Sequence, residues 1–418
     1  MTERADRVLI VGAGIIGIAC AYYLRKCGYR VTIIEKDEFG AACSQGNLGY
    51  VCPSHVLPLT EPGAIAMGIK SLLSPRAPFR IKPQLRASLL AWMWQFAKRC
   101  NHRSMLRGGR HLHSMIAASA DEYRKLLAET SMDAEWKESG LLFVFQTERG
   151  LQQYSATDDL LSAEFGLAST RLDGGELNDF EPATRPGLAG AFHYDTDAFL
   201  RPEKLMSNWA RLLQDDGVEI LENCELQDLE KQSGRITTVT TSKGTMQADQ
   251  YVFASGAWSG RMGNMLDCKI PVEPGKGYSM TMTRSQHCPS KPMLFPEHHV
   301  GVTPFDDGYR LGSIMEFAGF DASIPDFRMR QLRDSAAPYL REPGGDEVVE
   351  QWYGWRPMTW DSLPIIGRLP RLANGILATG HNMLGVTLAP VTGRLVSEIA
   401  AETRTFVDAT PFSPDRFS

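Results

Sequence analysis

Residues 7–36, RVLIVGAGIIGIACAYYLRKCGYRVTIIEK, constrain the fold more than any other part of this chain. The strand expected over residues 7–11 is almost wholly apolar, as is typical of a parallel strand buried on both faces. Three closely spaced glycines follow, and the pattern then predicts a helix from Ile15 to Cys27 that ends at Gly28. RVTII predicts a second parallel strand. The segment therefore predicts a β-α-β unit at the start of a doubly wound sheet.

The three glycines, Gly12, Gly14 and Gly17, indicate what this unit binds. At this spacing they permit a tight turn, close approach of a pyrophosphate, and packing of the helix on the sheet. The N-terminus of the helix stabilises phosphate charge. Glu35 follows at the tip of the second strand, eighteen residues after Gly17, where it can accept hydrogen bonds from a ribose. The motif predicts an adenine dinucleotide and leaves both NAD and FAD open.

Composition excludes several classes of function. The chain has 418 residues, enough for two domains, and a net charge of −5, which gives no reason to expect a nucleic-acid partner. Eight cysteines without a C-x-x-C pair indicate reduced thiols and a cytoplasmic protein. The histidines show no zinc spacing, so we expect no metal site.

Residues 62–120 contain no Asp or Glu, but they contain ten basic residues together with Trp92, Trp94 and Phe96. The basic residues are Lys70, Arg76, Arg80, Lys82, Arg86, Lys98, Arg99, Arg103, Arg107 and Arg110. One interpretation is a solvated helical face. The other is a surface that contacts an anionic membrane, on the inner face of the cell membrane, or a quinone or other electron-acceptor partner. No transmembrane span is expected, so membrane contact would be peripheral.

Six blocks in order along the chain resemble the D-amino-acid oxidase family of flavoproteins. They are GAGIIG with Glu35, ACSQGNLGYVCPSH, LLAWMWQFAKRCN, QADQYVFASGAWS, PGKGYSMTM, and the C-terminal block GWRPMTWDSLPIIGRLP with NGILATGHNMLGVTLAPVTGRLVSEIA. Within the family, the chain is most similar to bacterial FAD-dependent D-amino-acid dehydrogenases, including those that act on hydroxy-D-proline. The blocks span nearly the whole chain.

The resemblance implies an α/β fold with a Rossmann-like FAD-binding domain of the glutathione-reductase type. It also implies a discontinuous α+β substrate domain that places a sheet over the flavin. Residues 1–56, 198–267 and 351–418 would form the FAD-binding domain. Residues 57–197 and 268–350 would form the substrate domain, in which residues 304–312 predict a hairpin.

The resemblance implies FAD as the cofactor and the set of residues that contact it. A helix expected to begin close to Gly385 would turn its N-terminus toward the flavin. The expected cofactor-binding residues are Gly12, Gly14, Ile16, Gly17, Glu35, Lys36, Cys43, Ser44, Gln45, Asn47, Leu48, Gly49, Leu226, Gly256, Trp258, Gly380, Leu384, Gly385, Val386 and Thr387.

Arg356 is the residue that the resemblance assigns to the substrate carboxylate. A guanidinium binds a carboxylate through two parallel hydrogen bonds, and Trp355 and Trp360 would exclude water around the pair. The alternative is a structural arginine whose stem is buried and whose charge reaches water. The other expected substrate-binding residues are Tyr278, His55, His299, Met315 and His381. Glycine oxidases of the family carry a second arginine where this chain has Met383, which weakens the case for glycine.

The resulting expectation is an enzyme that oxidises a D-amino acid, or a cyclic one such as hydroxy-D-proline, by hydride transfer from Cα to flavin N5. The imino acid would hydrolyse to a keto acid, and the electrons would pass to a quinone or another acceptor. One alternative is an oxygen-using amine oxidase of the glycine or sarcosine kind. Another is a non-catalytic flavin scaffold or electron-relay subunit.

Overall fold

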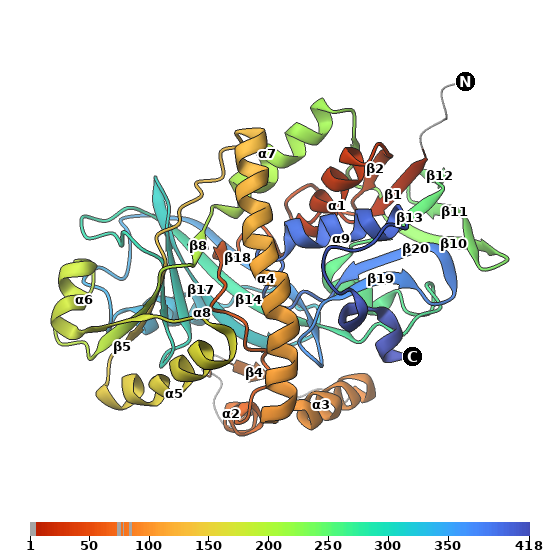
Figure 1. The fold of residues 1–418 in the computed structure, drawn as a ribbon. Coiled ribbons are helices and arrows are strands. Elements are labelled where there is room, and N and C mark those ends of the chain that lie inside the picture. The colour runs from red at the N-terminus through yellow and green to blue at the C-terminus, as the bar shows by residue number, and fades with distance from the viewer. Residues whose placement is uncertain (1–5, 73–76, 78, 83–85) are drawn as a thin grey trace.

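The computed structural model describes residues 6–72, 77, 79–82 and 86–418. Within them, two large sheets dominate the fold, one on each side of the molecule in Figure 1. The long helix α4 (His102–Thr130) runs between them in the foreground. Arg76 and the side chain of Lys70 lie outside the described residues.

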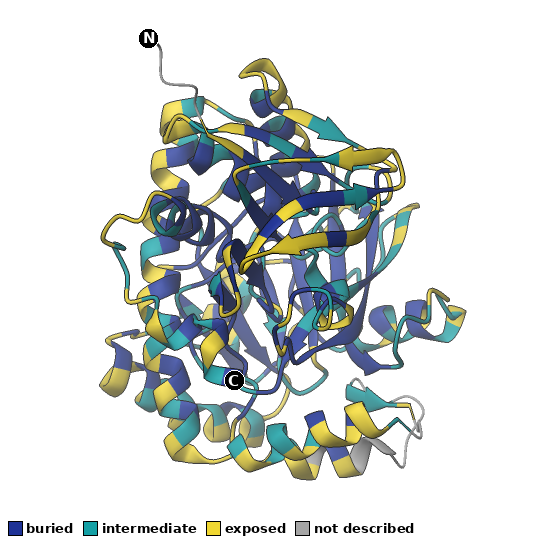
Figure 2. Ribbon diagram, turned by 90° about the vertical axis from the view of Figure 1, so that its right-hand side faces the viewer, coloured by how far each residue is buried: buried dark blue, intermediate teal, exposed yellow. Residues whose placement is uncertain are grey.

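The six-stranded sheet has the order β19-β20-β13-β1-β2-β9 and is parallel except for β19, which pairs antiparallel with β20. Its strands are β1 (Arg7–Val11), β2 (Arg30–Ile34), β9 (Glu219–Leu221), β13 (Gln250–Phe253), β19 (Ile365–Leu369) and β20 (Leu372–Thr379). Val8 and Ile10 of β1 enter one hydrophobic core, and Leu9 and Val11 enter another. The strand is thus buried on both faces, as its sequence predicts. Figure 2 shows the strands in the interior of the molecule largely in the colour of buried residues.

The first β-α-β unit forms as expected, with α1 (Ile15–Lys26) between β1 and β2. Gly12 has a φ of +109°, and a Cβ there would lie 2.6 Å from the carbonyl oxygen of Ala254 in the loop after β13. A Cβ on Gly17 would lie 1.9 Å from the carbonyl oxygen of Gly12. The two glycines are therefore needed for the turn to fit between strand and helix.

The nine-stranded sheet runs in the order β18-β14-β17-β16-β15-β5-β7-β6, with β4 paired to β17. Its strands are β4 (Phe79–Ile81), β5 (Leu141–Phe145), β6 (Thr170–Asp173), β7 (Gly190–Tyr194), β14 (Val272–Thr283), β15 (Met293–Phe295), β16 (Val300–Pro304), β17 (Gly308–Phe317) and β18 (Val348–Thr359). β16 and β17 form the predicted hairpin. β14, β17 and β18 carry most of the residues discussed below.

The other elements surround these sheets. The helices are α2 (Ala64–Leu72), α3 (Ala87–Arg99), α5 (Glu148–Phe165), α6 (Gly174–Phe180), α7 (Pro202–Asp215), α8 (Asp326–Ala336) and α9 (Ala389–Ala400), with short 3₁₀ turns η1 (Gly256–Arg261), η2 (Thr410–Phe412) and η3 (Pro414–Phe417). The small sheets are β3 (Tyr50–Val51) with β8 (Ala198–Phe199), and β10 (Leu226–Gln232), β11 (Arg235–Thr241) and β12 (Gly244–Met246). No helix in the described ranges is long and apolar enough to cross a bilayer.

The observed architecture confirms the expected fold class, a doubly wound α/β unit joined to a second sheet. Every strand of the six-stranded sheet comes from the segments expected to form the FAD-binding domain. β18 begins in the expected substrate domain and crosses the expected boundary after residue 350. The domain bounds themselves stay a prediction.

Candidate functional site

Two adjoining cavities lie between the sheets. The larger, of about 650 Å³, is walled by β14, β16, β17 and β18 and by α2 and α3. The smaller, of about 310 Å³, lies at the carboxyl ends of β1, β2 and β13. Cys43, Asn47, Arg356 and Met383 line both, so the cavities meet at these residues. We call them the inner cavity and the dinucleotide cavity.

Most of the predicted cofactor residues line the dinucleotide cavity. They are Gly12, Gly14, Ile16, Glu35, Lys36, Cys43, Ser44, Asn47, Leu226, Gly256, Trp258, Gly385 and Val386. Leu48, Leu384 and Thr387 line the inner cavity instead. The remaining four predictions, Gly17, Gln45, Gly49 and Gly380, do not appear in the lining of either cavity.

Glu35 lies at the mouth of the glycine turn. Its Oε2 accepts a hydrogen bond of 2.8 Å from the backbone N–H of Ala13. The Nζ of Lys36 lies 4.1 Å from the centre of the Trp258 ring, on the same rim. The carboxylate is therefore held beside the N-terminus of α1, where a ribose next to a bound pyrophosphate would reach it.

The loop between β2 and β3 is held by the nine-stranded sheet. Arg310, fully buried on β17, donates from Nη1 to the carbonyl oxygens of Gln45 (3.0 Å) and Asn47 (2.8 Å). Ser279 donates to the carbonyl of Gly46 (2.8 Å), and Thr303 donates to that of Leu48 (2.6 Å). Four consecutive carbonyls, 45 to 48, are thus bound from the sheet side. Asn47 lines both cavities, so this segment lies where they meet, and we call residues 45–48 the flavin loop after the cofactor expected there.

A second loop, residues 384–388, is held in the same way by α4. Tyr123 donates to the carbonyl of Val386 and Ser119 to that of Thr387, each at 2.6 Å. The helix that was expected to begin close to Gly385 begins at Ala389, because residues 385–388 form turns. Its N-terminus still faces the cavities through this loop.

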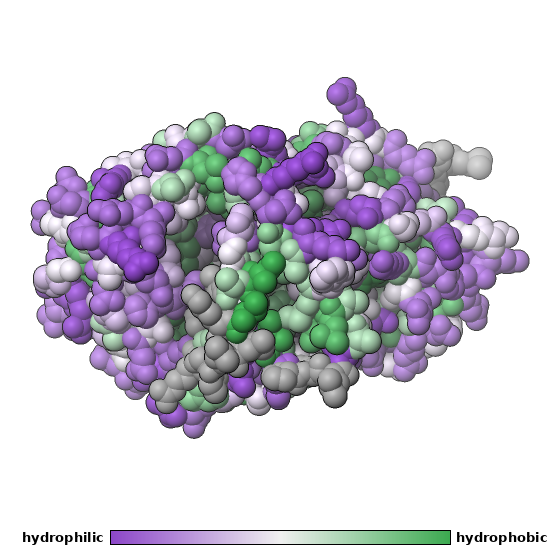
Figure 3. All heavy atoms as spheres, turned by 90° about the horizontal axis from the view of Figure 1, so that it is seen from below, coloured by the Kyte–Doolittle hydropathy of each residue, from purple (hydrophilic) through white to green (hydrophobic). Residues whose placement is uncertain are grey.

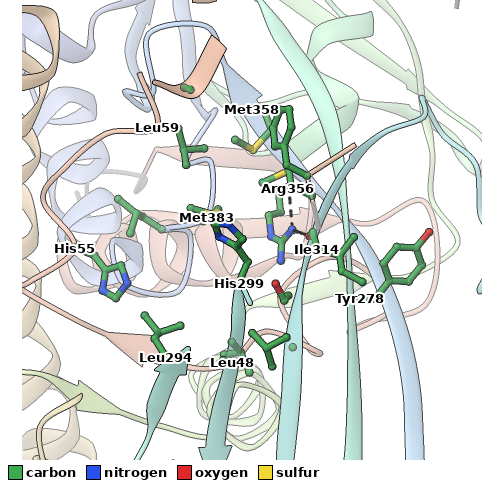
Figure 4. A pocket seen from close by; sticks show the side chains of 18 of the residues that line it. Leu48, His55, Leu59, Tyr278, Leu294, His299, Ile314, Arg356, Met358 and Met383 are labelled. Carbon is green, nitrogen blue, oxygen red and sulfur yellow. Dashed lines mark hydrogen bonds between the residues drawn. The ribbon is translucent and has the colours of Figure 1, made fainter. Parts of the chain in front are cut away.

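Arg356 projects from β18 into the junction of the cavities (Figure 4). Its Nη1 donates to the carbonyl oxygen of Ile314 at 2.7 Å, and the Sδ of Met315 lies 4.0 Å away. Within the described residues it forms no ion pair with a carboxylate, and burial lowers the pKa of its guanidinium from the ordinary value. An arginine nevertheless stays charged, so this cation is available to an anion that enters the cavity.

The carbonyl that holds Arg356 comes from a strained residue. Ile314 has a φ of +65°, a left-handed conformation that is rare for a β-branched side chain. It lies where the pairing of β14 with β17 shifts register. Such conformations cost roughly 1–3 kcal/mol and collect at functional sites, and here the result is a carbonyl turned toward the guanidinium.

The two tryptophans expected to shield Arg356 do not do so. Trp355 neighbours Arg356 along a strand and so points to the opposite face, where it packs against Trp258 and Phe320. Trp360 packs against Phe417. Trp352, four residues before Arg356, lines the inner cavity in their place. The period of two along a strand accounts for Trp355, whereas Trp360 lies beyond the end of β18.

Four other expected substrate residues line the inner cavity: His55, Tyr278, His299 and Met315. His55 and His299 are both labelled in Figure 4, and they come from different segments, the one after β3 and the other just before β16. Burial lowers the pKa of His55 to about 4 and also lowers that of His299. Both rings are therefore neutral at neutral pH and can accept a hydrogen bond.

His55 also belongs to a buried polar group. A ring nitrogen of His55, the Sγ of Cys52 and a carboxylate oxygen of Asp197 lie within 4.8 Å of one another. Asp197 accepts hydrogen bonds from the backbone N–H and the hydroxyl of Ser54. Nδ1 of His55 is buried and has no hydrogen-bond partner within the described part of the chain.

Tyr278 and His381 do not present their polar atoms to the inner cavity. The Tyr278 hydroxyl donates to Oε2 of Glu316 at 2.9 Å and points away from Arg356 in Figure 4. His381 lines the dinucleotide cavity, and its Nε2 lies 3.0 Å from Oγ1 of Thr392 in α9. The Tyr278 ring lines the inner cavity while its hydroxyl is bound to Glu316, and the substrate roles expected of Tyr278 and His381 stay predictions.

The residues present fit a flavin dinucleotide. The dinucleotide cavity combines a helix N-terminus with a ribose-directed carboxylate, and it opens into an apolar space behind the flavin loop. Sequence reasoning missed the polar side chains that position this loop, namely Ser279, Thr303 and Arg310. It also missed Gly277, whose lack of a side chain makes room for Arg356.

Comparison with known proteins gives relatives over nearly the whole chain. D-amino acid dehydrogenase of Granulibacter bethesdensis is 29% identical over 418 residues, covering 99% of this chain and 100% of the relative. D-amino acid dehydrogenase of Neisseria meningitidis serogroup C is 30% identical over 419 residues, covering 98% and 99%. The solved glycine oxidase of Geobacillus kaustophilus has a TM-score of 0.77 at 24% identity and covers 98% of each chain, which shows the shared fold.

The family model described as FAD dependent oxidoreductase matches residues 7–399. FAD is thus the cofactor of the site, and the NAD alternative is set aside. This chain belongs to the family of FAD dependent oxidoreductases.

Proposed function

We propose that this enzyme oxidises a D-amino acid whose carboxylate binds Arg356. The observation that carries the proposal is the buried guanidinium at the junction of the cavities, which has no carboxylate partner in the described part of the chain. One N–H of its fork is bound to Ile314, and the others remain for a ligand. The names of relatives about 30% identical over nearly the full length support a D-amino acid as the substrate.

The chain's own residues would bind and orient the substrate. Arg356 fixes the carboxylate, while Leu48, Leu294 and Met315 provide apolar walls that exclude water. Neutral His299 or His55 can accept a hydrogen bond from the amine of the substrate. Bound FAD would supply the oxidising chemistry by accepting a hydride equivalent from Cα.

The product would be an imino acid, which water hydrolyses to a keto acid and ammonia. A cyclic substrate such as hydroxy-D-proline would give a cyclic imine instead. The electrons would leave to a quinone or another acceptor. The apolar character of the inner cavity suits a substrate with a neutral side chain, including a ring.

An oxygen-using amine oxidase of the glycine or sarcosine kind is the second candidate. The fold shared with glycine oxidase favours it, and Met383 at the place of that family's second arginine speaks against glycine itself. A non-catalytic flavin subunit is a weaker reading, because such a subunit has no use for a buried, unpaired arginine beside its cofactor.

Anaerobic bleaching of the flavin tests the proposal. The purified protein is mixed with D- and L-amino acids, glycine, sarcosine, and the proline and hydroxyproline isomers, and the flavin absorbance is followed. We expect one or more D-amino acids to bleach it and their L-enantiomers to be much slower. Bleaching by glycine or sarcosine alone would favour the amine oxidase, and bleaching by none would favour the scaffold.

A further inference from the structure

A cysteine, a histidine and an aspartate meet at the wall of the inner cavity. Cys52 and His55 follow β3, Asp197 comes directly before β8, and these two short strands pair with each other. The sulfur, a ring nitrogen and a carboxylate oxygen of the three lie within 4.8 Å of one another. Thiolate, imidazole and carboxylate are the side-chain groups that bind zinc in proteins. The spacing along the chain does not indicate this cluster, because Asp197 is far from the other two residues in sequence.

The ring of His55 is placed by its aromatic neighbours. Tyr50 stacks on it with 6.4 Å between the ring centres, and Phe143 packs against it at 5.7 Å. The buried Nδ1 atom has no hydrogen-bond partner among the residues that the structure describes. A buried polar atom without a partner is costly, and one explanation for such an atom is a water or an ion that binds there. His55 therefore has the capacity for one further bond.

Ser54 orients the carboxylate of Asp197. Its backbone N–H donates to Oδ1 at 3.0 Å, and its hydroxyl donates to Oδ2. Each carboxylate oxygen accepts more than one bond, so both can still bind a cation. Hydrogen bonds that fix the direction of a ligand in this way are typical of metal sites. The Sγ of Cys52 makes a long contact of 3.8 Å with the carbonyl of Ala198, which a bond to a metal would readily replace.

The charges and the spacing of the cluster suit a divalent cation. As ligands, Cys52 and Asp197 carry one negative charge each and His55 is neutral, so a charge of +2 cancels them. Both anions are buried, at 1% and 0% exposure, where such neutralisation matters most. Zinc bonds of about 2.0–2.3 Å place tetrahedral ligand atoms roughly 3.3–3.6 Å apart. The three atoms reach that spacing by an approach of no more than about 1.5 Å, which side-chain rotation can supply.

An ion can reach the cluster through the inner cavity, which Cys52 and His55 both line. Ile65 and Ile69 of α2 also line this cavity and are 44% and 60% exposed, so the cavity opens to solvent beside α2. Figure 3 shows this side of the molecule, with hydrophobic residues gathered at the centre of the face. Three protein ligands beside a cavity leave the fourth position of a zinc ion to an exchangeable water.

We propose that Cys52, His55 and Asp197 bind a thiophilic divalent cation such as Zn²⁺, with its fourth position toward the inner cavity. The ion takes the place of the thiol proton and of any proton on the carboxylate, and no electron is transferred. The thiolate and the imidazole select against Mg²⁺ and Ca²⁺, which prefer oxygen ligands. Because its ligands follow β3 and precede β8, the bound ion ties these two segments together.

Metal titration tests the site without reference to activity. The FAD-loaded protein is first freed of metal with a chelator and then titrated with Zn²⁺ or Cd²⁺, and bound metal is measured by equilibrium dialysis. We expect one tight equivalent of either ion, with an ultraviolet band from the bond between Cd²⁺ and the thiolate. The melting temperature should rise, because an ion that binds the folded state stabilises it. Mg²⁺ should produce neither the band nor the rise.

Variants assign the ion to the cluster. Cys52→Ser should lose the Cd²⁺ band, and Cys52→Ser, His55→Gln and Asp197→Asn should each bind Zn²⁺ more than about a hundredfold more weakly, since even an outer partner of a ligand contributes roughly 10–100-fold. Cys20→Ala removes a buried thiol of α1 and should bind the ion normally. The flavin absorbance shows that each protein is folded. An unaltered protein that binds no ion, or a Cys52→Ser protein with the same band and affinity, would overturn the proposal and leave the cluster as a hydrogen-bonded group.

Discussion

A Cβ atom on Gly277 would lie 2.3 Å from Nη1 of Arg356 and 2.4 Å from its Cζ. The guanidinium therefore lies directly against the backbone of β14, in space that only a glycine leaves free. On its other side, Nη1 is bound to the carbonyl of Ile314. Gly277 leaves space for the guanidinium, and the carbonyl of Ile314 binds it. Together they define where a substrate carboxylate would meet Arg356.

Gly277→Ala should displace Arg356 and weaken substrate binding while leaving FAD in place. A displacement of about 1 Å at a positioning residue can lower the rate roughly a hundredfold. Gly344→Ala is the matched control, because a Cβ there would lie no closer than 3.8 Å to any neighbour. The measurement is the concentration dependence of anaerobic flavin reduction. A Gly277→Ala protein that behaves like the Gly344→Ala protein would show that the guanidinium has room to move.

The hydroxyls that hold the flavin loop should matter for cofactor retention. Ser279→Ala and Thr303→Val each leave a loop carbonyl without its donor, which costs about 1–3 kcal/mol when the group is buried. We expect weaker FAD binding and a shifted flavin absorption spectrum. Thr237→Val, which removes an exposed hydroxyl bound to the carbonyl of Glu230, is the control. Titration of FAD into the apoprotein separates the outcomes, and unaltered affinity and spectrum in both variants would show that the loop needs no such support.

Local signals along the chain predict the dinucleotide half of the site well. The glycine turn, the strand RVTII and Glu35 act over about thirty consecutive residues, and the structure places all of them as expected. Strand and helix periods are local properties of the backbone, so a single segment contains the information.

The inner cavity is harder to predict because it is built from distant segments. Arg310 holds Gln45 across 265 positions of sequence, and nothing near either residue indicates the other. The side of the strand that Trp355 faces was missed because the strand period was neglected, and the bond of the Tyr278 hydroxyl was missed because its partner Glu316 lies on another strand. The exposure of Ile69 and Trp94 also depends on how two helices are packed, which composition alone does not show.

Glu35→Ala should reduce FAD retention. The carboxylate accepts hydrogen bonds from the backbone N–H groups of Ala13 and Asp37 and is the acidic group at the tip of β2 beside the dinucleotide cavity. Hydrogen bonds to a charged group contribute about 1.5–3 kcal/mol, which corresponds to a loss of affinity of roughly ten- to a hundredfold. Glu38→Ala, three residues later and exposed, should bind FAD normally. Equal dissociation constants for the two variants would contradict the assignment of Glu35 to the ribose.

Asp197 should make the stability of the protein depend on pH. Burial raises the pKa of its carboxyl to about 7, against roughly 3.9 in an unfolded chain. Between those values the folded protein keeps a proton that the unfolded chain releases. The free energy of unfolding should therefore fall as the pH rises, by up to about 1.4 kcal/mol per pH unit from this group.

Asp197→Asn removes this titration, so its unfolding free energy should change less between about pH 4 and pH 7 than that of the unaltered protein. Asp334→Asn, an exposed aspartate on α8, provides the control. Denaturant unfolding at several pH values gives the comparison. Parallel pH profiles for all three proteins would mean that Asp197 is ionised throughout.

Arg356 is the residue on which the proposed function depends most. Arg356→Lys replaces a planar fork with a point charge, and Arg356→Ala removes the charge and also leaves the Ile314 carbonyl without its donor. Loss of a charged hydrogen bond should reduce the stabilisation of the transition state by roughly 2–4 kcal/mol. The value of kcat/KM for the amino acid should therefore fall by a factor between about tens and several hundreds. The lysine variant should lose less than the alanine variant, since it keeps a cation in the cavity. Both should keep FAD, because the glycine turn and the flavin loop are held by other residues.

Amines without a carboxylate distinguish a substrate-binding arginine from a structural one. If Arg356 binds the carboxylate, such amines should reduce the flavin at nearly the same slow rate in all three proteins, whereas amino acids should not. If its role is only to satisfy Ile314, Arg356→Ala should lower the melting temperature while the amino acid still bleaches the flavin at the normal rate. Thermal melts and flavin reduction measured on the same three proteins decide between these results, because a carboxylate contact changes the second measurement and a purely structural contact changes the first.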